Sequence, residues 1–408
     1  MSPQAAADGA PPKVILAVNI GSSSLKFSTH PIQRGLSDDS VGPSIFGGNI
    51  QGLEPGGRPS VHWSVNGDRH EAALHAEAHE DNLQAALRVL KTLLSQQHAQ
   101  QIAAIAHRVV HGGDHFSDAV VVTPEILTEL HRLDPLAPLH QPHNLRGISA
   151  FAQSFADVPQ VACFDTAFHS QIPRAEKTFP LTRELYSQGV RRYGFHGLSY
   201  QYVSSRLLKK TAAAGKRLLM AHLGNGSSLC ACVNGKSFST TMGFSAVGGL
   251  MMGTRCGDLD PGVVLYLVQQ GMDAKALENL FYRQSGLKGL SGLSADMRTL
   301  RDSTSDEARF AIEVYEHRVI REAGGLIAAM GGVDAIAFAG GIGENDRLLR
   351  NDVCLGLGFL GVALDDQANQ TASNDEITPL HANHSKVEVW IVPTDEGVIA
   401  AEQALALL

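Results

Sequence analysis

The feature that most constrains this chain is a strand–turn–strand phrase that occurs twice, about half the chain length apart. In the first copy, the apolar run 14–18 leads into Asn19 and a glycine–serine turn over 20–24. In the second copy, the apolar run 218–221 leads into His222 and a similar turn over 223–228. Such a turn presents backbone N–H groups and hydroxyls to an anion, and its glycine lets the anion approach closely. Two copies in two similar halves predict a duplicated protein that binds one phosphate chain from both sides.

The composition is that of a globular protein with two domains. The chain has 408 residues, more than one core comfortably supports, of which 44% are hydrophobic and 18% charged. A formal net charge of −8 argues against a nucleic acid or an anionic membrane as the main partner. The five cysteines are scattered along the chain, so they are predicted to be small buried residues and not zinc ligands. This pattern is typical of a reduced cytoplasmic protein.

Neither a secretory leader nor a membrane span is expected. Residues 1–12 contain Asp8 and no basic residue, so they are predicted to form a flexible tail rather than a signal peptide. The longest apolar stretch, 323–342, contains six glycines and Asp334. That pattern favours a helix, a turn and a buried strand.

Hydrophobic periodicity predicts a similar order of elements in both halves. The first half is predicted to contain edge strands within 35–69 joined by a turn at Asn66–Gly67, a helix over 80–97, a strand over 102–110, a helix after Pro124, and a strand over 158–164. The second half is predicted to contain strands over 218–222, 335–339 and 387–392, helices through 262–282 and 305–330, and a C-terminal helix that packs on the first domain. Candidate functional groups repeatedly follow strand ends, where ligands bind in open α/β sheets.

Three cationic segments lie beside glycines: 106–113 with Arg108, 191–197 with Arg192 and His196, and 253–258 with Arg255. Arginine forks recognise carboxylate and phosphate, and glycine lets a substrate come close. An arginine at a strand end can equally form a surface ion pair. Three such segments beside two phosphate-type turns favour a shared polyanion site.

Two groups of residues contain side chains of the kind that bind metal ions. His107, His111 and His115 recur every four residues, but this spacing aligns ligands only on a helix, and the valines and glycines between them indicate a strand and a turn. Asp165, Asn19 and Glu396 offer oxygen ligands from separate strand ends and are better suited to a hard cation such as magnesium. The alternative for Asp165 is a helix cap, which Thr166 could also provide.

Several nucleotide and nucleophile motifs are absent from the sequence. It has no G-x-x-x-x-G-K-[ST] loop, no dinucleotide G-x-G-x-x-G fingerprint and no G-x-S-x-G elbow. A phosphoryl-transfer protein with two similar halves and no P-loop is typical of the actin-like nucleotide fold.

As a set, the motifs resemble those of the acetate kinase family over nearly the whole chain. The matching segments are residues 19–26, 107–113, 164–169, 193–197, 222–228, 249–255, 341–345 and 394–396. The resemblance implies reversible phosphoryl transfer from ATP to acetate, giving ADP and acetyl phosphate, with Mg²⁺ or Mn²⁺ as the metal. It also implies a cytoplasmic homodimer with no nucleic acid or membrane partner.

The same resemblance implies an α/β fold of two duplicated actin-like (ribonuclease H-like) domains. Each is expected to be a mixed sheet flanked by helices, with the nucleotide in the cleft between them. The implied boundaries give an acceptor and magnesium domain at 13–165 plus 396–408, and a nucleotide-binding and dimerisation domain at 166–395.

Site residues follow from the resemblance, position by position. Asn19 and Glu396 are implied as the magnesium site. Arg108 is implied as a catalytic contact to the substrate carboxylate, Asp165 as the catalytic carboxylate, and His196 and Arg255 as transition-state stabilisers. The acetate methyl pocket falls on Val110, Leu139, Phe195 and Ala246. The nucleotide site falls on Lys26, His222, Leu223, Gly224, Asn225, Gly226, Asp296, Met297, Arg298, Gly341, Ile342, Gly343, Glu344 and Asn345.

The chemistry of these residue types agrees with the implied roles. The oxygens of a phosphoryl group in transfer carry charge, which Arg108, Arg255 and His196 could stabilise. A carboxylate nucleophile is already ionised at neutral pH, because carboxyl pKa values lie around 4. Asp165 therefore need not act as a strong base, and we expect it mainly to orient magnesium and its waters.

The sequence departs from the commoner family pattern at three places. Leu198, Ser199 and Tyr200 stand where many members have threonine and histidine, Ala246 replaces a frequent proline, and Gly248 a frequent acidic residue. Ala246 is expected to enlarge the methyl pocket, while Val110 should still restrict it. One methylene is worth about 1–3 kcal/mol of discrimination, so partial use of propionate is expected.

Two rival functions are compatible with these motifs. One is a carboxylate kinase that acts on propionate or butyrate. The other is an ATP-driven switch protein related to actin, which would need a peptide-binding or filament-forming extension. We do not expect such an extension, because the sequence ends eight residues after Ala400.

Overall fold

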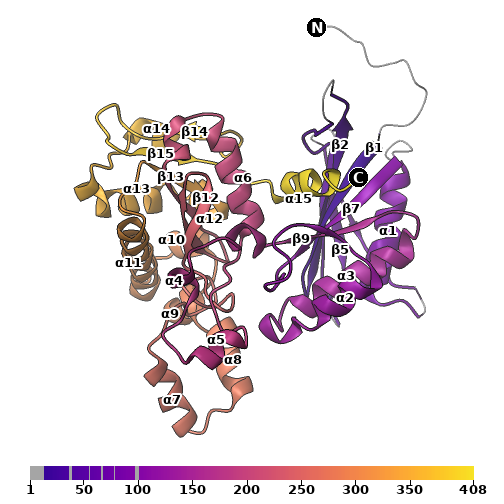
Figure 1. Ribbon diagram of the computed structural model, residues 1–408, viewed down its shortest axis with the longest axis horizontal. Helices are drawn as coiled ribbons and strands as arrows, with labels where there is room; N and C mark the ends of the chain where they lie inside the picture. Colours follow the sequence, from indigo (N-terminus) through magenta and orange to yellow (C-terminus); the bar gives the residue numbers. More distant parts are fainter. Residues whose placement is uncertain (1–12, 36–38, 55, 66–67, 78, 97–100) are drawn as a thin grey trace. The chain divides into compact units, whose positions relative to one another are not determined.

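The computed structural model describes residues 13–35, 39–54, 56–65, 68–77, 79–96 and 101–408. The predicted tail (1–12) and the predicted turn at Asn66–Gly67 lie outside these residues. The chain divides into two compact units: Met1–Ala167 with Asp395–Leu408 (unit 1), and Phe168–Thr394 (unit 2). In Figure 1 the yellow C-terminal helix joins the indigo and purple strands of unit 1.

Unit 1 is built on a nine-stranded sheet in which β1 pairs antiparallel with β2 and parallel with β7, and β7 pairs parallel with β9. The strand order is β6-β5-β4-β2-β1-β7-β9-β8, with β3 beside β2. The strands are β1 (Lys13–Ile20), β2 (Ser24–Gln33), β3 (Ser40–Val41), β4 (Phe46–Gln51), β5 (Ser60–Val65), β6 (Asp68–Ala73), β7 (Gln101–Val109), β8 (Val120–Val121) and β9 (Gln160–Phe164).

Helices cover both faces of this sheet. They are α1 (Asn82–Gln96), α2 (Pro124–His131), α3 (Gln141–Ser154) and α15 (Glu396–Leu405). In α1, the buried Leu83, Leu87 and Leu90 recur at helical spacing and share a core cluster with Val18 of β1 and Phe151 of α3. α15 contacts β1 and β7 and lies across the sheet from α1 and α3 (Figure 1). The predicted helix over 80–97 and the predicted strands over 102–110 and 158–164 are confirmed, within one or two residues at most ends.

Unit 2 repeats the central pattern of unit 1 in a six-stranded sheet of order β12-β11-β10-β13-β15-β14. β10 pairs antiparallel with β11 and parallel with β13, which pairs parallel with β15. The strands are β10 (Arg217–His222), β11 (Ser228–Val233), β12 (Lys236–Thr240), β13 (Ala335–Ala339), β14 (Thr378–Pro379) and β15 (Glu388–Ile391). The prediction of two duplicated mixed sheets is confirmed.

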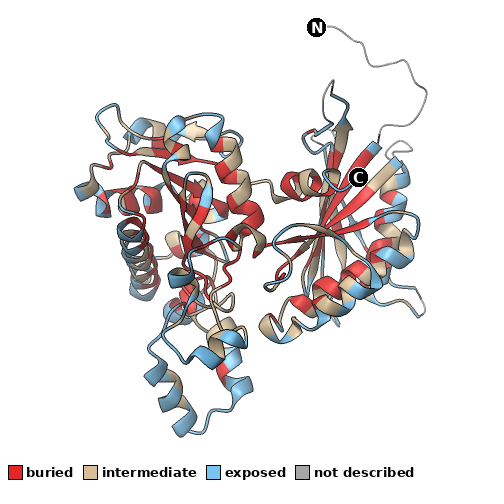
Figure 2. Cartoon of the chain, in the orientation of Figure 1, coloured by how far each residue is buried: buried red, intermediate tan, exposed pale blue. Residues whose placement is uncertain are grey.

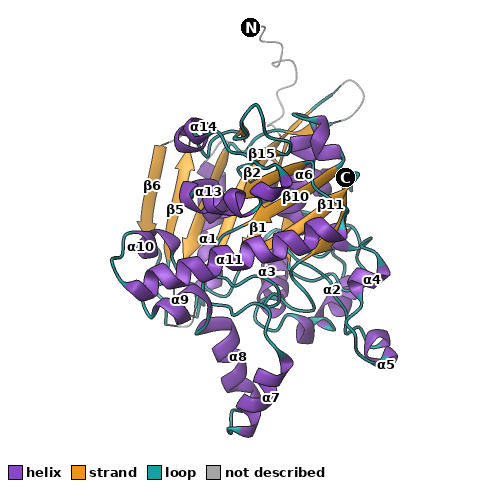
Figure 3. Cartoon of the chain, turned by 90° about the vertical axis from the view of Figure 1, so that its left-hand side faces the viewer, coloured by secondary structure: helices purple, strands orange, loops and turns teal. Residues whose placement is uncertain are grey.

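Alternate residues of β10 face different helices. Leu219 clusters with α11 (Asp306–Ala329), whereas Leu218 and Met220 cluster with α6 (Gly197–Leu208). The buried strands appear red in Figure 2, and Figure 3 shows the helices that cover them in purple. The other helices are α4 (Arg174–Lys177), α5 (Arg183–Ser187), α7 (Pro261–Gln269), α8 (Ala274–Arg283), α9 (Gly286–Ser291), α10 (Met297–Arg301), α12 (Gly340–Asn345), α13 (Arg347–Gly356) and α14 (Asp366–Thr371).

Two features of unit 2 add to the sequence predictions. Residues 262–282 form two separate helices, α7 and α8, with Gly271 at φ 92° between them. The segment after β13 folds directly into the short helix α12. Among the described residues, we find no helix with the length and apolarity needed to cross a bilayer.

Candidate active site

Four predicted residues of unit 1 meet at the ends of its parallel strands. Arg108 lies near the end of β7, Asp165 follows β9, Asn19 lies near the end of β1, and Glu396 is the first residue of α15. Arg108 donates to Asp165 through Nε–Oδ1 (3.1 Å) and Nη2–Oδ2 (2.5 Å). Its Nη1 lies 3.4 Å from Asn19 Oδ1, and its Nε lies 3.7 Å from Glu396 Oε2. We call these four residues the unit 1 cluster.

Burial sets the electrostatics of the unit 1 cluster. Asp165 is only 1% exposed. Burial raises its pKa to about 6, an effect that Arg108 partly offsets and that the charge of Glu396 reinforces. Burial disfavours the charge of Arg108, but Asp165 and Glu396 outweigh it and raise the pKa of the guanidinium above its ordinary value. Near neutral pH the cluster therefore holds a fixed cation between two carboxylates.

The alternative role of Asp165 as a helix cap is not what the structure shows. Its carboxylate pairs with Arg108, while the neighbouring Thr166 accepts a hydrogen bond from the amide of Gly112 (3.0 Å) through its hydroxyl. Thr166 thereby fixes the turn that follows β7. The carboxylate of Asp165 instead belongs to the unit 1 cluster.

The donor set of the unit 1 cluster suits a hard cation. It offers carboxylate oxygens of Asp165 and Glu396 and the amide oxygen of Asn19 around one guanidinium. Magnesium bound to phosphates needs only one or two protein oxygens, so these residues fit the metal predicted for them. Across the described ranges, no group of three or more His, Cys, Asp and Glu side chains could hold a metal ion.

Two histidines of the 107–115 segment, His107 and His111, have other partners. His107 Nε2 lies 2.7 Å from Gln160 Oε1, and His111 Nδ1 accepts from the amide of Gly113 (2.9 Å). Burial lowers the pKa of both imidazoles to about 4. They occupy a strand and a turn, as their sequence context predicted.

Residues 19–24, which we call turn 1, connect β1 to β2. The amide of Gly21 donates to the carbonyl of Ser24 (2.8 Å), while the side chains of Ser22 and Ser23 are exposed. Asn144 of α3 donates to the carbonyl of Ile20 (2.6 Å). Turn 1 is thus held by backbone atoms and one amide side chain, and both of its central hydroxyls face solvent.

The other predicted residues of unit 1 lie on segments next to this turn. Exposed Lys26 pairs in register with Asn19, so both side chains project from the same face of the β1–β2 hairpin. The amide of buried Val110 donates to Asn144 Oδ1 (3.0 Å), and partly buried Leu139 lies just before His140, the N-cap of α3. The methyl-pocket prediction for Val110 and Leu139 also requires Phe195 and Ala246 of unit 2, and it stays a prediction.

His196 is held in an unusual backbone conformation at the start of α6. Its φ of 61° is left-handed, which is uncommon for a residue other than glycine and is found at sites that the surroundings over-determine. Two contacts fix the preceding loop: His169 Nε2 lies 3.0 Å from the carbonyl of Phe195, and the amide of Tyr193 donates to the carbonyl of Gly243 (3.0 Å). The loop therefore presents the imidazole in one defined position.

The ring of His196 is bounded by hydroxyls and a second imidazole. Its Nδ1 lies 2.8 Å from Ser228 Oγ, and its ring centroid lies 4.3 Å from that of His222. His222 Nδ1 is in turn 2.7 Å from Ser199 Oγ. The predicted nucleotide residue His222 and the predicted catalytic residue His196 are therefore brought together.

Arg255 approaches the same place from another loop. Its Nη1 donates to the carbonyl of Ala246 (2.9 Å) and lies 3.4 Å from Met252 Sδ. A Cβ atom built on Gly226 would lie 3.3 Å from His196 Nε2 and 3.5 Å from Arg255 Nη2. A guanidinium and an imidazole thus converge on Gly226, and a larger residue there would press on both. We call His196, Gly226 and Arg255 the unit 2 cluster.

The turn over residues 222–228, which we call turn 2, is braced from inside the protein. Ser227 Oγ donates to the carbonyl of Gly224 (2.9 Å), accepts from its amide (3.2 Å), and lies 2.7 Å from Tyr315 Oη. Ser228 Oγ lies 2.5 Å from Tyr200 Oη. Both serines and both tyrosines are buried.

The predicted segment after β13 lies against turn 2. The amides of Ile342 and Gly343 both donate to the carbonyl of Leu223 (2.8 and 3.1 Å), and Gly340 adopts a φ of 75° to make the turn. Glu344 Oε1 accepts from the amides of Gly340 (2.8 Å) and Thr394 (3.0 Å). The carboxylate of Glu344 therefore braces the backbone of this predicted nucleotide segment.

The segment with Asp296, Met297 and Arg298 also reaches turn 2. Asp296 caps α10 and pairs with exposed Arg298 (2.8 Å), whose hydrogen bond lowers the pKa of the carboxyl to about 2. Met297 is buried in the core. A Cβ on Gly253 would meet both the side chain of Asn225 and the carbonyl of Ala295, so these two predicted nucleotide segments are neighbours.

One predicted cation has a different role. The guanidinium of Arg192 donates to four backbone carbonyls, those of Glu176, Thr240, Thr241 and Met242, at 2.7–3.1 Å. The hypothesis that this arginine belongs to a shared polyanion site is wrong. The guanidinium of Arg192 links its own loop to the segments at Glu176 and at residues 240–242. Of the residues in segment 191–197, His196 is the one that lies at the candidate site.

The buried hydroxyl partners of turn 2 are not predicted from the sequence. Tyr315 belongs to none of the predicted motifs, and Tyr200 stands out only as a departure from the family pattern. The signal available in the sequence was the pair of adjacent serines in turn 2. It did not reveal that each serine bonds to a tyrosine on a different helix.

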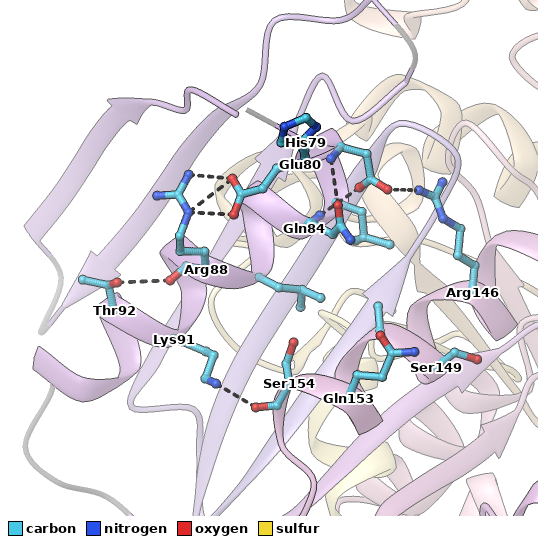
Figure 4. A pocket seen from close by; sticks show the side chains of 14 residues that line it. His79, Glu80, Gln84, Arg88, Lys91, Thr92, Arg146, Ser149, Gln153 and Ser154 are labelled. Carbon is cyan, nitrogen blue, oxygen red and sulfur yellow. Dashed lines mark hydrogen bonds and ion pairs between the residues drawn. The ribbon is translucent and has the colours of Figure 1, made fainter. Parts of the chain in front are cut away.

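A separate hollow of about 850 Å³ lies between α1 and α3 of unit 1 (Figure 4). Its charged residues pair within its walls: Arg88 with Glu80 (2.9 Å), Arg146 with Asp81 (2.6 Å), and Lys91 with the carbonyl of Ser154 (2.7 Å). It contains none of the predicted site residues.

Comparison with known proteins agrees with this picture. The sequence profile of the acetokinase family matches residues 14–402. The acetate kinase of Rhodopseudomonas palustris is 46% identical over 402 residues, covering 97% of this chain and 98% of that protein. The acetate kinase of Rickettsia typhi is 41% identical over 397 residues, covering 97% and 99%.

Solved structures give the same fold. An acetate kinase from Porphyromonas gingivalis matches with a TM-score of 0.85 and 34% identity, covering 97% of this chain and 99% of that one. A propionate kinase from Francisella tularensis matches with a TM-score of 0.86 and 34% identity, covering 96% and 98%. The predicted fold class, a duplicated actin-like α/β protein, is confirmed.

Proposed function

This chain belongs to the acetokinase family, and we propose that it transfers the γ-phosphoryl group of ATP reversibly to acetate, giving acetyl phosphate and ADP. The observation that best supports this reaction is the convergence of His196 Nε2 and Arg255 Nη2 on Gly226 within a phosphate-type turn. A positioned guanidinium and a positioned imidazole N–H donor are what the spreading charge of a transferring phosphoryl group requires.

The unit 1 cluster would serve the acceptor. A carboxylate substrate is ionised at neutral pH, and a guanidinium fork such as Arg108 matches its geometry. Asn19 and Glu396 would hold magnesium, with manganese as a substitute, and Asp165 would orient it. When bound, the metal would neutralise negative charge on the phosphate oxygens. The methyl group of acetate would lie against Val110, Leu139, Phe195 and Ala246.

Unit 2 would serve the nucleotide. Turn 2, with residues 222–226, offers backbone amides to the phosphates, and its brace by Ser227 keeps those amides in place. The segments 296–298 and 341–345 lie against turn 2 and would contact the rest of ATP or ADP. Lys26 of unit 1 would add a cation to the nucleotide site.

The decisive assay is the formation of an acyl phosphate, trapped as a hydroxamate, from ATP with acetate, propionate and butyrate in parallel. We expect acetate to give the highest kcat/KM. ATP hydrolysis that does not depend on any carboxylate would instead favour the switch class of actin-like proteins.

A propionate-type specificity is the second candidate. Ala246 adds room at the predicted methyl pocket, and the solved propionate kinase is as similar in structure as the solved acetate kinase. We expect propionate to be used with lower kcat/KM, because one methylene is worth about 1–3 kcal/mol. A kcat/KM for propionate equal to that for acetate would require the acceptor to be revised.

The metal role of Asp165 has its own test. Asp165→Asn keeps the shape of the side chain but removes its charge, so we expect the magnesium concentration for half-maximal rate to rise about tenfold or more. Calorimetric titration with Mn²⁺ gives a second measure of metal affinity. Lost turnover with unchanged metal dependence would contradict the role.

We also propose a cytoplasmic homodimer, with α7 in the subunit interface. None of the residues of α7 is buried, and its apolar side chains stand open, with Leu265 63% and Tyr266 59% exposed (Figure 2). Leu265→Glu should give monomers in analytical ultracentrifugation. Leu355→Glu, on a leucine of α13 that is 70% exposed, is the matched control and should leave the dimer intact. Dissociation by both variants, or by neither, would contradict the assignment of α7.

A further inference from the structure

We propose that Tyr200 and Ser228 are positioning residues that hold His196 as the neutral ring with its proton on Nε2. Nε2 is the nitrogen that lies beside Gly226 in turn 2. The inference rests on the proposed function, in which this nitrogen donates a hydrogen bond to the transferring phosphoryl group.

The three side chains form one hydrogen-bonded line through the interior of unit 2. Tyr200 of α6 lies with its Oη 2.5 Å from Ser228 Oγ, and Ser228 Oγ lies 2.8 Å from His196 Nδ1. Tyr200 and Ser228 are both 0% exposed, so neither hydroxyl exchanges its partner for bulk water. The line ends at the imidazole.

The direction of the protons follows from the tyrosine. Burial raises the pKa of Tyr200 far above its ordinary value, so its hydroxyl keeps its proton and must donate it. The backbone amide of His222 also bonds to this hydroxyl oxygen, which leaves Ser228 Oγ as the acceptor for the tyrosine proton.

Ser228 then has one proton to give. Because its oxygen accepts from Tyr200, its own O–H points to His196 Nδ1, which must be the unprotonated nitrogen. A neutral imidazole with an acceptor at Nδ1 carries its proton on Nε2. The protein therefore presents an N–H donor beside Gly226 before any substrate binds.

This arrangement suits the proposed chemistry. A donor that is already oriented costs no reorganisation when charge develops on a phosphoryl oxygen. The opposite tautomer would present a lone pair to the same oxygen, and the wrong tautomer of a catalytic histidine is known to be costly in general. The left-handed backbone of His196 and its tilted contact with the ring of His222 help to fix the position of the imidazole.

The chain offers a matched control in the adjacent residue. Ser227 forms the same kind of pair with Tyr315 (2.7 Å), and that serine and tyrosine are also buried. The hydroxyl of Ser227 leads to the backbone of Gly224 and not to an imidazole. Tyr315→Phe therefore removes an equivalent hydroxyl without breaking the line to His196.

The test is the ¹⁵N spectrum of imidazole in the full-length, ligand-free protein labelled at histidine, with His196→Gln to assign the signal. The wild type should show His196 protonated at Nε2 only. Tyr200→Phe frees Ser228 to donate or accept, so both tautomers should appear. Ser228→Ala should do the same, Ser228→Thr should restore the wild-type signal, and Tyr315→Phe should leave it unchanged.

Kinetics provide the second readout. We expect kcat to fall about tenfold in Tyr200→Phe and about 100-fold in Ser228→Ala, with the KM for acetate nearly unchanged. A wild-type ring protonated at Nδ1, or a Tyr200→Phe spectrum equal to that of the wild type, would overturn the inference. Since the spectra need no substrate, that result is distinct from failure of the kinase assay, which would overturn the proposed function.

Discussion

Turns 1 and 2 carry similar residues yet are held in different ways. In turn 1, Ser22 and Ser23 are exposed, and the turn is closed by a backbone bond and by Asn144. In turn 2, Ser227 and Ser228 are buried, and each bonds to a buried tyrosine. The same glycine–serine phrase therefore places its hydroxyls outside the protein in one copy and inside it in the other.

This difference separates two uses of one motif. The hydroxyls of turn 1 remain accessible to a ligand, beside a cluster whose cation already lies between carboxylates. The hydroxyls of turn 2 are committed to the fold, so contacts to a ligand there must come from backbone amides and from His196 and Arg255. Duplication preserved the chain path, and the neighbouring helices determined what each serine does.

The largest effect should come from the glycines of the two turns. A methyl group at Gly226 would lie 3.3 Å from His196 Nε2, closer than ordinary contact, whereas one at Gly21 would lie 3.8 Å from Ser24 Oγ. Gly226→Ala should lower kcat/KM about 100-fold. The added methyl group would displace His196, and a displacement of up to about 1 Å near the reacting atoms can reduce the rate by this factor. Gly21→Ala should lower kcat/KM less than about tenfold. Steady-state kinetics of both variants measure this difference. Equal losses of kcat/KM would contradict the proposed difference between the two turns.

The serines of turn 1 and turn 2 should contribute differently to the free energy of unfolding. Ser227→Ala removes a hydroxyl that bonds Gly224 and Tyr315 inside the protein, so the free energy of unfolding should fall by about 2 kcal/mol. Ser23→Ala removes an exposed hydroxyl and should change it by less than about 0.5 kcal/mol. Urea unfolding of the two variants at neutral pH provides the comparison. A loss in Ser23→Ala as large as that in Ser227→Ala would show that turn 1 is also braced by its hydroxyls.

The paths of both turns could be predicted from the sequence. Short apolar runs such as Ala335–Ala339 gave strands with the expected bounds, since a run buried on both faces has few other ways to fold. Arg108 and Asp165 are both predicted at strand ends, where ligands bind, and the parallel pairing of β7 with β9 brings those two ends together.

The direction of individual side chains could not be predicted. Arg192 has the glycine-rich surroundings of an anion ligand, yet it faces inward onto carbonyls. Tyr315 reaches Ser227 across 88 residues of sequence, because α11 packs under β10. Such contacts depend on tertiary packing, and local spacing carries no trace of them.

The smallest expected effects, which are also similar in the two units, come from two buried histidines. His107 in unit 1 and His169 in unit 2 are both buried, and burial lowers the pKa of each to about 4. In the unfolded chain a histidine titrates near 6.5, so between pH 6.5 and 4 the unfolded state binds more protons. The stability that each neutral ring contributes is present above pH 6.5 and is lost as the pH falls towards 4.

We expect each histidine to contribute a slope of about 1.4 kcal/mol per pH unit within that window. His107→Gln and His169→Gln should each reduce the slope of the unfolding free energy against pH by about that amount. Because the chain has two tryptophans, Trp63 in unit 1 and Trp390 in unit 2, Trp390→Phe and Trp63→Phe backgrounds report the units separately by fluorescence. Only His169→Gln should also lower kcat, since His169 holds the carbonyl of Phe195 beside His196 while His107 bonds Gln160. Equal kcat losses in the two variants would mean that the loop before His196 does not depend on His169.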